Sequence, residues 1–246
     1  MSRDAEPGAL SRAAFVARLR DEGRERYHDH HPFHVAMHAG QLSRSELQAW
    51  VRNRYYYQTR IPVKDAIILS KSEDPVFRRS WIRRIRDHDG DVEGEGGLAL
   101  WLRLAEGVGL DPVEVASCRE VLPGVRFACD AYVDLVRDRT LVEAVASSLT
   151  EFFAPDLMSK RIGAWEQHYP WVKSEVLDYF RSRVPRAQRD SEEALSFVVE
   201  QATSRDLQER CVAALITKTQ ILWHLLDCIV DAGRSRERPS ERPSSP

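Results

Sequence analysis

The segment that begins at Ser43 places a cation on the face of a helix that should be apolar. Ser43 and Glu46 fit a Ser-x-x-Glu capping box, so we expect a helix to start there and to end or kink at Pro62. Helical spacing defines an apolar stripe of Leu47, Trp50, Val51 and Ile61. The same face also carries Arg54, Tyr57 and Gln58.

Two later helices repeat this anomaly. In the segment 171–183 the stripe is Val172, Val176, Tyr179 and Arg183, and near the C-terminus Lys218 lies among Cys211, Ala214, Leu215, Ile221, Leu222, Leu225 and Cys228. A buried charge left without a partner costs about 3 to 5 kcal/mol. Internal carboxylates can satisfy these cations, or a pocket can receive an anionic ligand with several acidic groups, and we favour the pocket.

The rest of the chain is also dominated by helical periodicity, and no segment has a convincing strand pattern. The 246 residues, with 43% hydrophobic content, are enough for one large core. We predict an all-α, single-domain bundle over residues 1–231. Residues 232–246 lack apolar side chains to bury and are expected to form a disordered tail.

Composition excludes several classes of partner. The 36 basic and 38 acidic residues nearly cancel, so no global charge attracts nucleic acid or a membrane surface. No segment approaches the roughly 20 apolar residues of a membrane span. The four cysteines form no Cys-x-x-Cys pair, and the start of the chain is charged, so we expect a cytoplasmic, reduced protein.

Metal and nucleotide motifs fail on spacing. His34 and His38 lie four residues apart, so they can share a helical face, but a carboxylate di-metal bundle needs two Glu-x-x-His pairs and only Glu25-Arg-Tyr-His28 fits. The acidic loop after residue 87 lacks the glycine and the bidentate acid of a calcium loop. There is no P-loop or dinucleotide fingerprint. We therefore predict no metal site.

Several other polar residues are ambiguous when taken one at a time. His88 lies on an apolar stripe and titrates near neutrality, so it is either a core histidine or a proton-transfer group. Glu151 can pair a buried cation or face a ligand. Tyr57 and Tyr132 are core aromatics whose hydroxyl groups need partners.

Long stretches of the chain, from about Ala13 to Ala232, resemble the PqqC family of pyrroloquinoline-quinone synthases. The similarity includes the segments Tyr-His-Asp-His-His-Pro-Phe-His (27–34), Asn-Arg-Tyr-Tyr-Tyr-Gln-Thr-Arg-Ile-Pro-Val-Lys-Asp (53–65), Asp-His-Asp-Gly (87–90), Leu-Pro-Gly-Val-Arg-Phe-Ala (122–128), Ser-Ser-Leu-Thr-Glu-Phe-Phe-Ala-Pro (147–155) and Tyr-Phe-Arg-Ser-Arg (179–183). The resemblance implies a heme-oxygenase-like (TenA-like) bundle of about seven main helices and a homodimer.

The same resemblance implies an activity. Members of the family catalyse the last step of pyrroloquinoline quinone (PQQ) biosynthesis, the ring closure and multi-electron oxidation of a bicyclic amino-quinone precursor with several carboxylates. Molecular oxygen is the co-substrate, hydrogen peroxide is released, and no metal or other cofactor is required. PQQ is the product, and transient contacts with other proteins of the pathway are expected.

The resemblance also assigns site residues. Those that would hold the carboxylates and quinone oxygens are His28, Arg54, Gln58, Lys64, Arg161 and Lys218, of which Lys218 also counts as catalytic. Those that would line the same cavity are Tyr57, Tyr132, Thr150 and Glu151. The oxygen-side catalytic group would be His88, Tyr179 and Arg183, with His88 moving protons.

One position departs from the family pattern, because Met158 stands where many members have histidine. The alternative to an enzyme is therefore a homologue that binds the quinone without turnover. Thiaminase-type relatives use a cysteine nucleophile where this chain has Glu151, and di-iron relatives use a His-x3-Asp-x2-His set where it has Tyr179, Arg183 and Arg186. Both of these chemistries are disfavoured.

Overall fold

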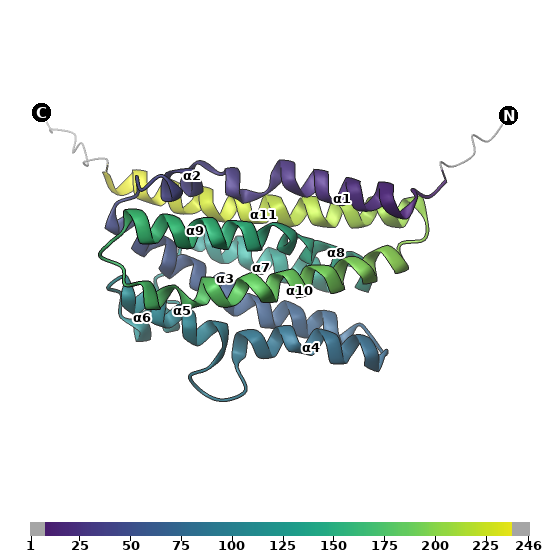
Figure 1. Cartoon of the computed structure of the whole chain (residues 1–246), viewed down its shortest axis with the longest axis horizontal. Helices are drawn as coiled ribbons and strands as arrows, with labels where there is room; N and C mark the ends of the chain where they lie inside the picture. The colour runs from purple at the N-terminus through teal and green to yellow at the C-terminus, as the bar shows by residue number, and fades with distance from the viewer. Residues whose placement is uncertain (1–7, 238–246) are drawn as a thin grey trace, which may run out of the picture.

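Helix α3 (Arg44–Ser70) runs through the middle of a bundle whose long helices lie along one common direction (Figure 1). The computed structural model describes residues 8–237. The other long helices are α1 (Arg12–Arg26), α4 (Pro75–Asp89), α5 (Gly96–Gly107), α7 (Pro123–Asp138), α9 (Ala154–His168), α10 (Asp178–Gln201) and α11 (Arg205–Glu237). Shorter segments are η1 (His28–His30), α2 (Pro32–His38), α6 (Pro112–Ser117), α8 (Leu141–Ser147), η2 (Ser148–Phe153) and η3 (Ser174–Leu177).

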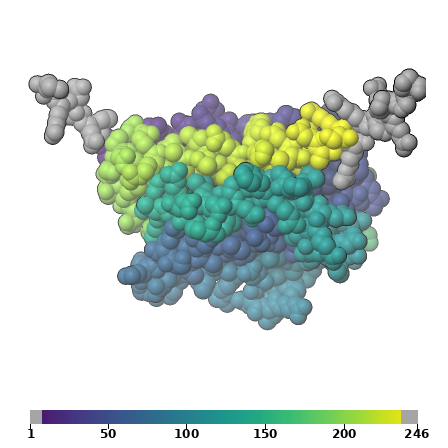
Figure 2. Space-filling model, turned by 180° about the vertical axis from the view of Figure 1, so that it is seen from behind, coloured from purple at the N-terminus to yellow at the C-terminus, as the bar shows by residue number. Residues whose placement is uncertain are grey.

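The prediction of an all-α single domain is confirmed for the described residues, which contain no strand. One continuous cluster of buried apolar side chains connects the helices. Helix α3 packs against α4 and α7, α10 packs against α9, and α11 packs against α1, α7 and α8. Figure 2 shows from behind that α11, in yellow and light green, lies along the teal segments of α7 and α8.

Helix α3 begins with the predicted capping box, in which Ser43 and Glu46 each bond the other's backbone N–H. The expectation that the helix ends at Pro62 is wrong, because the helix continues to Ser70. Proline has no N–H, so the carbonyl of Gln58, four residues earlier, loses its intrahelical donor. Packing against the neighbouring helices outweighs that loss.

The chain changes helix type between α8 and α9. We expected one helix from Thr140 to Ala154, but α8 ends at Ser147 and the next six residues form the 3₁₀ segment η2. Pro155 then starts α9, a position that suits its missing N–H. Short 3₁₀ stretches are common connectors between helices, and this one carries Thr150 and Glu151.

Helix α10 covers a region in which the sequence predicts two helices, one from Trp171 and one from Asp190. The segment from Trp171 forms loop and the 3₁₀ turn η3 rather than a helix start, and α10 then runs unbroken through Pro185 and Asp190. As a result, Tyr179 and Arg183 lie in the first turns of α10, where the side chains at positions i and i+4 share one face.

Helix α11 is long and apolar enough to cross a membrane by composition alone, but half of its most apolar window is buried within the bundle. Core packing accounts for that hydrophobicity. The helix also continues past Ala232, so the residues up to Glu237 that we expected to belong to the tail are helical. The remainder of that segment, 238–246, lies outside the described residues.

Candidate active site

A polar cavity with a volume of ≈ 70 Å³ lies inside the bundle and is walled by residues from η1, α3, α4, η2, α9 and α10. That is room for several water molecules. The cavity brings together most of the predicted site residues, namely His28, Arg54, Tyr57, Gln58, His88, Thr150, Glu151, Arg161, Tyr179 and Arg183. Lys64, Tyr132 and Lys218 are absent from its walls.

Helix α3 supplies one wall because consecutive turns face the cavity. The guanidinium of Arg54 lies 3.9 Å from the centre of the Tyr57 ring. One turn further along, Gln58 accepts a 2.7 Å hydrogen bond from the hydroxyl of Tyr179 on α10. This bond joins two helices across the cavity and fixes the position of the tyrosine hydroxyl.

Arg183 of α10 faces Glu151 of η2 without a close ion pair. Its nearest carboxylate oxygens are 3.9 Å away on Glu151 and 3.8 Å away on Asp190, beyond hydrogen-bond distance. Glu151 instead accepts a 3.0 Å bond from Arg84 of α4. The carboxylates therefore hold Arg183 loosely and leave it available to another acceptor.

Three arginines on the cavity wall have buried N–H donors without a partner in the protein. The atoms are Arg54 Nη1, Arg161 Nε and Arg183 Nη1. Among the described residues, neither Arg54 nor Arg161 forms an ion pair. An unsatisfied buried donor costs about 1 to 3 kcal/mol, and more when the group is charged. Such a set of donors is what an anionic ligand with several oxygens requires.

Lys218 lies behind the Tyr57 ring, not in the cavity. Its side-chain nitrogen is 2.9 Å from the Tyr57 hydroxyl and 3.3 Å from the centre of the Tyr132 ring. The two rings are nearly parallel, 8° apart. Ring faces favour a charged lysine, whereas burial, followed by Arg54, lowers the pKa of Lys218 well below its usual value. Lys218 is fully buried and forms no ion pair among the described residues, so the downward shift of its pKa is the stronger effect.

Lys64 is held by the protein itself. It forms a 2.6 Å ion pair with its neighbour Asp65 and a 3.0 Å hydrogen bond to Ser148, and both charged side chains are only 1% exposed. The interpretation of Lys64 as a free ligand-binding cation therefore finds no support in this arrangement, because its charge is already compensated.

The histidines of the cavity are neutral. Burial, followed by Arg183, lowers the pKa of His88 to about 3. Its Nδ1 lies 3.0 Å from the backbone oxygen of Arg84, which can only accept, so Nδ1 carries the proton and Nε2 is left as an acceptor. Burial and Arg54 likewise lower the pKa of His28 well below its usual value.

The two carboxylates near Arg183 differ in proton affinity. Burial raises the pKa of Glu151 despite its bond to Arg84. The pKa of Asp190 is lowered, because the attraction of Arg84, Arg183 and Arg189 together exceeds the effect of burial. The pair therefore has an ionised member at Asp190 and a member that takes up a proton more readily at Glu151, next to the cavity.

Several residues that line the cavity were not among the predicted site residues, although Ile61 and Leu222 had been placed on apolar stripes and Met158 had been noted as a departure from the family pattern. The cavity is also lined by Tyr27, Ile61, Trp101, Ala154, Met158 and Leu222. Arg84, 2% exposed, lies directly behind Glu151 and His88. We had placed Ile85 on the buried stripe of its helix, but Arg84 faces inward and Ile85 is only half-buried. The position of Arg84 four residues before His88 is a signal that could have identified it.

Two buried histidines of the histidine-rich segment have partners within the chain. Within residues 8–237, no group of three or more histidine, cysteine or acidic side chains is placed to hold a metal ion. His34 instead contacts Arg161, and His31 contacts Asp227. The cation of Arg161 beside His34 opposes the binding of a metal ion there.

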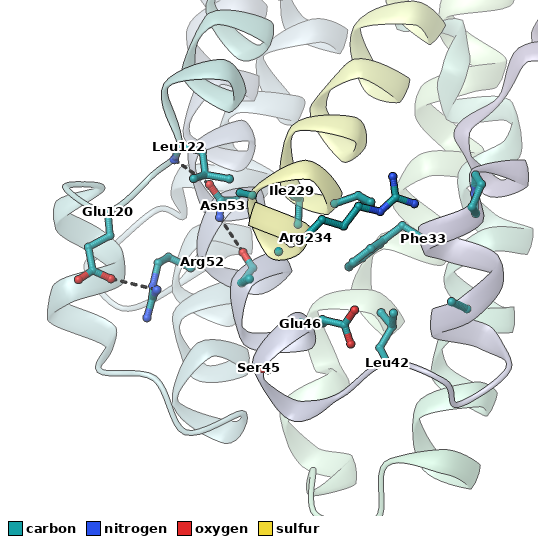
Figure 3. A pocket seen from close by; sticks show the side chains of 16 residues that line it. Phe33, Leu42, Ser45, Glu46, Arg52, Asn53, Glu120, Leu122, Ile229 and Arg234 are labelled. Atoms are coloured by element: carbon teal, nitrogen blue, oxygen red, sulfur yellow. Dashed lines mark hydrogen bonds and ion pairs between the residues drawn. The ribbon is translucent and has the colours of Figure 1, made fainter. Parts of the chain in front are cut away.

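A second and larger cavity, of ≈ 420 Å³, lies at the end of α11 (Figure 3). Its polar side chains are engaged within the chain: Arg52 pairs with Glu120 at 3.0 Å, and Asn53 accepts from the backbone of Leu122 at 2.9 Å. Phe33 and Ile229 contribute apolar walls. Among the described residues, no side chain of this cavity has a buried, unpartnered N–H donor such as those of Arg54, Arg161 and Arg183, so it is less suited than the smaller cavity to bind an anionic substrate.

Solved structures share this fold at low sequence identity. A domain of unknown function with a heme oxygenase-like fold from Shewanella denitrificans superposes with a TM-score of 0.73 at 12% identity, covering 96% of this chain and 99% of that one. A TenA homologue from Pseudomonas syringae gives a TM-score of 0.70 at 15% identity, covering 94% and 99%. The heme-oxygenase-like fold expected from the sequence is thus confirmed.

Sequence relatives are much closer. A pyrroloquinoline-quinone synthase of Rhizobium meliloti is 52% identical over 91% of this chain and 88% of its own length, and one of Pseudomonas aeruginosa is 50% identical over 90% and 88%. The model of the TENA/THI-4/PQQC family matches residues 16–228. With matches of this extent, the chain belongs to the TENA/THI-4/PQQC family.

Proposed function

We propose that this protein is a pyrroloquinoline-quinone synthase that oxidises a bicyclic amino-quinone carrying several carboxylates, using molecular oxygen and no metal or organic cofactor. The observation that carries the proposal is the set of three buried arginines, Arg54, Arg161 and Arg183, each with a donor that has no partner among residues 8–237. Relatives with about half of their residues identical carry that enzyme name.

Substrate binding would use the cationic walls. Arg54 and Arg161 offer free N–H donors to carboxylates, and Tyr57 supports Arg54 from beneath. A bound polyanion would raise the lowered pKa of Lys218, so that this lysine becomes fully charged once substrate is present. Thr150 and Gln58 would orient the quinone oxygens.

The opposite wall would handle oxygen chemistry. Each two-electron oxidation passes two electrons to oxygen and needs two protons to give hydrogen peroxide. Arg183 would stabilise negative charge on the reduced oxygen or the reduced intermediate. His88 presents an unprotonated Nε2 and can accept a proton from the substrate, while the Tyr179 hydroxyl, fixed by Gln58, can donate a hydrogen bond.

The decisive experiment supplies the precursor to the purified protein under air. Oxygen uptake should accompany the appearance of the finished quinone, and neither should occur under nitrogen. Tight binding of the quinone without oxygen consumption would instead identify a binding homologue, the alternative that Met158 keeps open. Met158 lines the cavity, with its sulfur 3.8 Å from Arg161 Nη1.

Independence from metal is tested separately. Activity should survive dialysis against a strong chelator, and elemental analysis should find no stoichiometric iron, copper or zinc. Restoration of lost activity by one added metal would overturn this part of the proposal.

We also propose a homodimer, as the family resemblance suggests, and a cytoplasmic location, as the cysteine pattern and the charged first residues suggest. Sedimentation of the purified protein should give twice the mass of the 28.2 kDa chain. A sedimentation coefficient that matches a single chain would contradict it.

A further inference from the structure

His34 is a buried histidine that bridges two residues of the cavity wall, although it has no part in the chemistry proposed above. It lies on α2 and is 1% exposed. Its Nδ1 is 2.9 Å from the backbone oxygen of His28, and its Nε2 is 3.3 Å from Arg161 Nη2. The sequence suggested only a metal-binding use for it.

The two contacts fix the tautomer of His34. The His28 carbonyl oxygen has no proton to give, so Nδ1 must carry the hydrogen and donate. Nε2 then has a lone pair and accepts from the guanidinium of Arg161. Burial and the adjacent Arg161 lower the pKa of His34 well below its usual value, in keeping with a neutral ring.

All the close partners of Arg161 are uncharged. Its guanidinium lies 4.9 Å from the Trp50 ring centre and 5.4 Å from that of Phe180, and Nη1 approaches the Met158 sulfur at 3.8 Å. His34 supplies the one strong acceptor in this set. A carboxylate in its place would orient Arg161 equally well but would cancel the charge that a ligand needs.

We propose that His34 is a positioning residue, which holds Arg161 by a neutral acceptor and thereby sets the affinity of the site for ligand carboxylates. The inference deepens the proposed function and rests on it. His34 is not among the residues that line the cavity, so its effect passes through the guanidinium of Arg161 and, by way of the Nδ1 bond, through the backbone at His28.

Three substitutions separate the two bonds. His34→Leu removes both. His34→Gln places an amide oxygen near the Nε2 position and keeps an acceptor for Arg161, whereas His34→Asn places an amide near Nδ1 and keeps only the donor to His28. Circular dichroism establishes that each variant is folded. The dissociation constant for PQQ, measured by spectroscopic titration, is the readout.

The Leu and Asn variants should raise the dissociation constant about tenfold, the order expected for one charge-assisted hydrogen bond, and Gln should restore most of the affinity. In turnover, KM should rise more than kcat falls. In an Arg161→Ala background the Leu substitution should have little further effect, because its influence passes through that arginine.

Equal affinity in all three variants would overturn the proposal, as would a loss in the Arg161→Ala background as large as in the wild type. A second probe, benzene-1,3,5-tricarboxylate, separates this inference from the proposed function. If the wild type binds the tricarboxylate but not the quinone, the proposed function fails. The role of His34 is then tested by the dissociation constants of the three variants for the tricarboxylate. If it binds neither, both fail.

Discussion

Lys218 is bonded to the hydroxyl of Tyr57 at 2.9 Å, and no carboxylate within the described part of the chain lies within ion-pair distance of it. Lys64, equally buried, is 2.6 Å from a carboxylate oxygen of Asp65. The chain thus contains two buried lysines of opposite character, one whose charge is compensated and one whose charge is disfavoured.

Replacing each lysine by methionine should therefore have opposite consequences. Lys218→Met should leave the melting temperature unchanged or raise it, because burial already disfavours the charge, while weakening PQQ binding at least about tenfold. Lys64→Met should destabilise the fold by about 3 to 5 kcal/mol, because Asp65 is left buried and unpaired. Chemical denaturation and ligand titration of both variants measure the contrast. Strong destabilisation by Lys218→Met with binding intact would contradict it.

Stability should fall on acidification through the usual pKa range of histidine. The pKa of His88 is about 3 in the folded protein and about 6.5 when unfolded, so the unfolded chain binds more protons between these values. The stabilisation is complete above about pH 6.5 and is lost as the pH falls, at up to about 1.4 kcal/mol per pH unit. Denaturation at a series of pH values should show this slope.

His88→Asn should make that slope shallower, because the amide can still donate to the Arg84 carbonyl but does not titrate. His30→Asn is the control, because the His30 side chain is 61% exposed and its replacement should leave the slope unchanged. An identical slope in the His88 variant would show that other groups cause the acid sensitivity.

Arg84 and Arg83 are adjacent arginines, each paired with a glutamate, but at different depths. Arg84 bonds Glu151 and is 2% exposed, whereas Arg83 pairs with Glu193 and is 46% exposed. Arg84→Met should cost about 3 to 5 kcal/mol of unfolding free energy, because it leaves a buried carboxylate, and Arg83→Met about 0 to 1 kcal/mol. Denaturant unfolding of the two variants measures both changes. Similar losses of unfolding free energy in the two variants would contradict this interpretation of Arg84.

Met158→His should raise turnover. Met158 lies one helical turn before Arg161, and a thioether cannot exchange protons as imidazole can. The groups proposed for oxygen chemistry are intact, so the wild type should turn over, more slowly than the variant by a factor up to about 10² to 10⁴. Oxygen uptake measures both. A variant no faster than the wild type would show that position 158 takes no part in proton transfer.

The positions of the long helices could be predicted because apolar residues repeat with the helical period and caps mark helix starts, as at Ser43. The points at which helices end or change type could not be predicted in the same way. Pro62 reads as a break, yet the helix continues because packing on both sides compensates for the missing hydrogen bond. The turn of 3₁₀ helix at 148–153 has no local signature that separates it from the α-helix before it.

Part of the candidate site could be predicted, because a cation on the apolar stripe of a helix is expected to be buried. Arg54, Arg183 and Lys218 were found that way. The stripe could not tell that Lys218 lies behind Tyr57 and not in the cavity, nor that Lys64 is paired with its own neighbour. Both depend on side-chain direction and on contacts between distant segments, which periodicity does not encode.

The cavity volume of ≈ 70 Å³ has a consequence for the time course of binding. Pockets that enclose drug-sized ligands measure about 300 to 1,000 Å³, so the proposed substrate, a bicyclic polycarboxylate, would enter only after the surrounding segments have moved apart. Such motions take microseconds to milliseconds. The observed association rate will therefore level off at the rate of opening as ligand concentration rises, and the departure of the finished quinone will wait on the same motion.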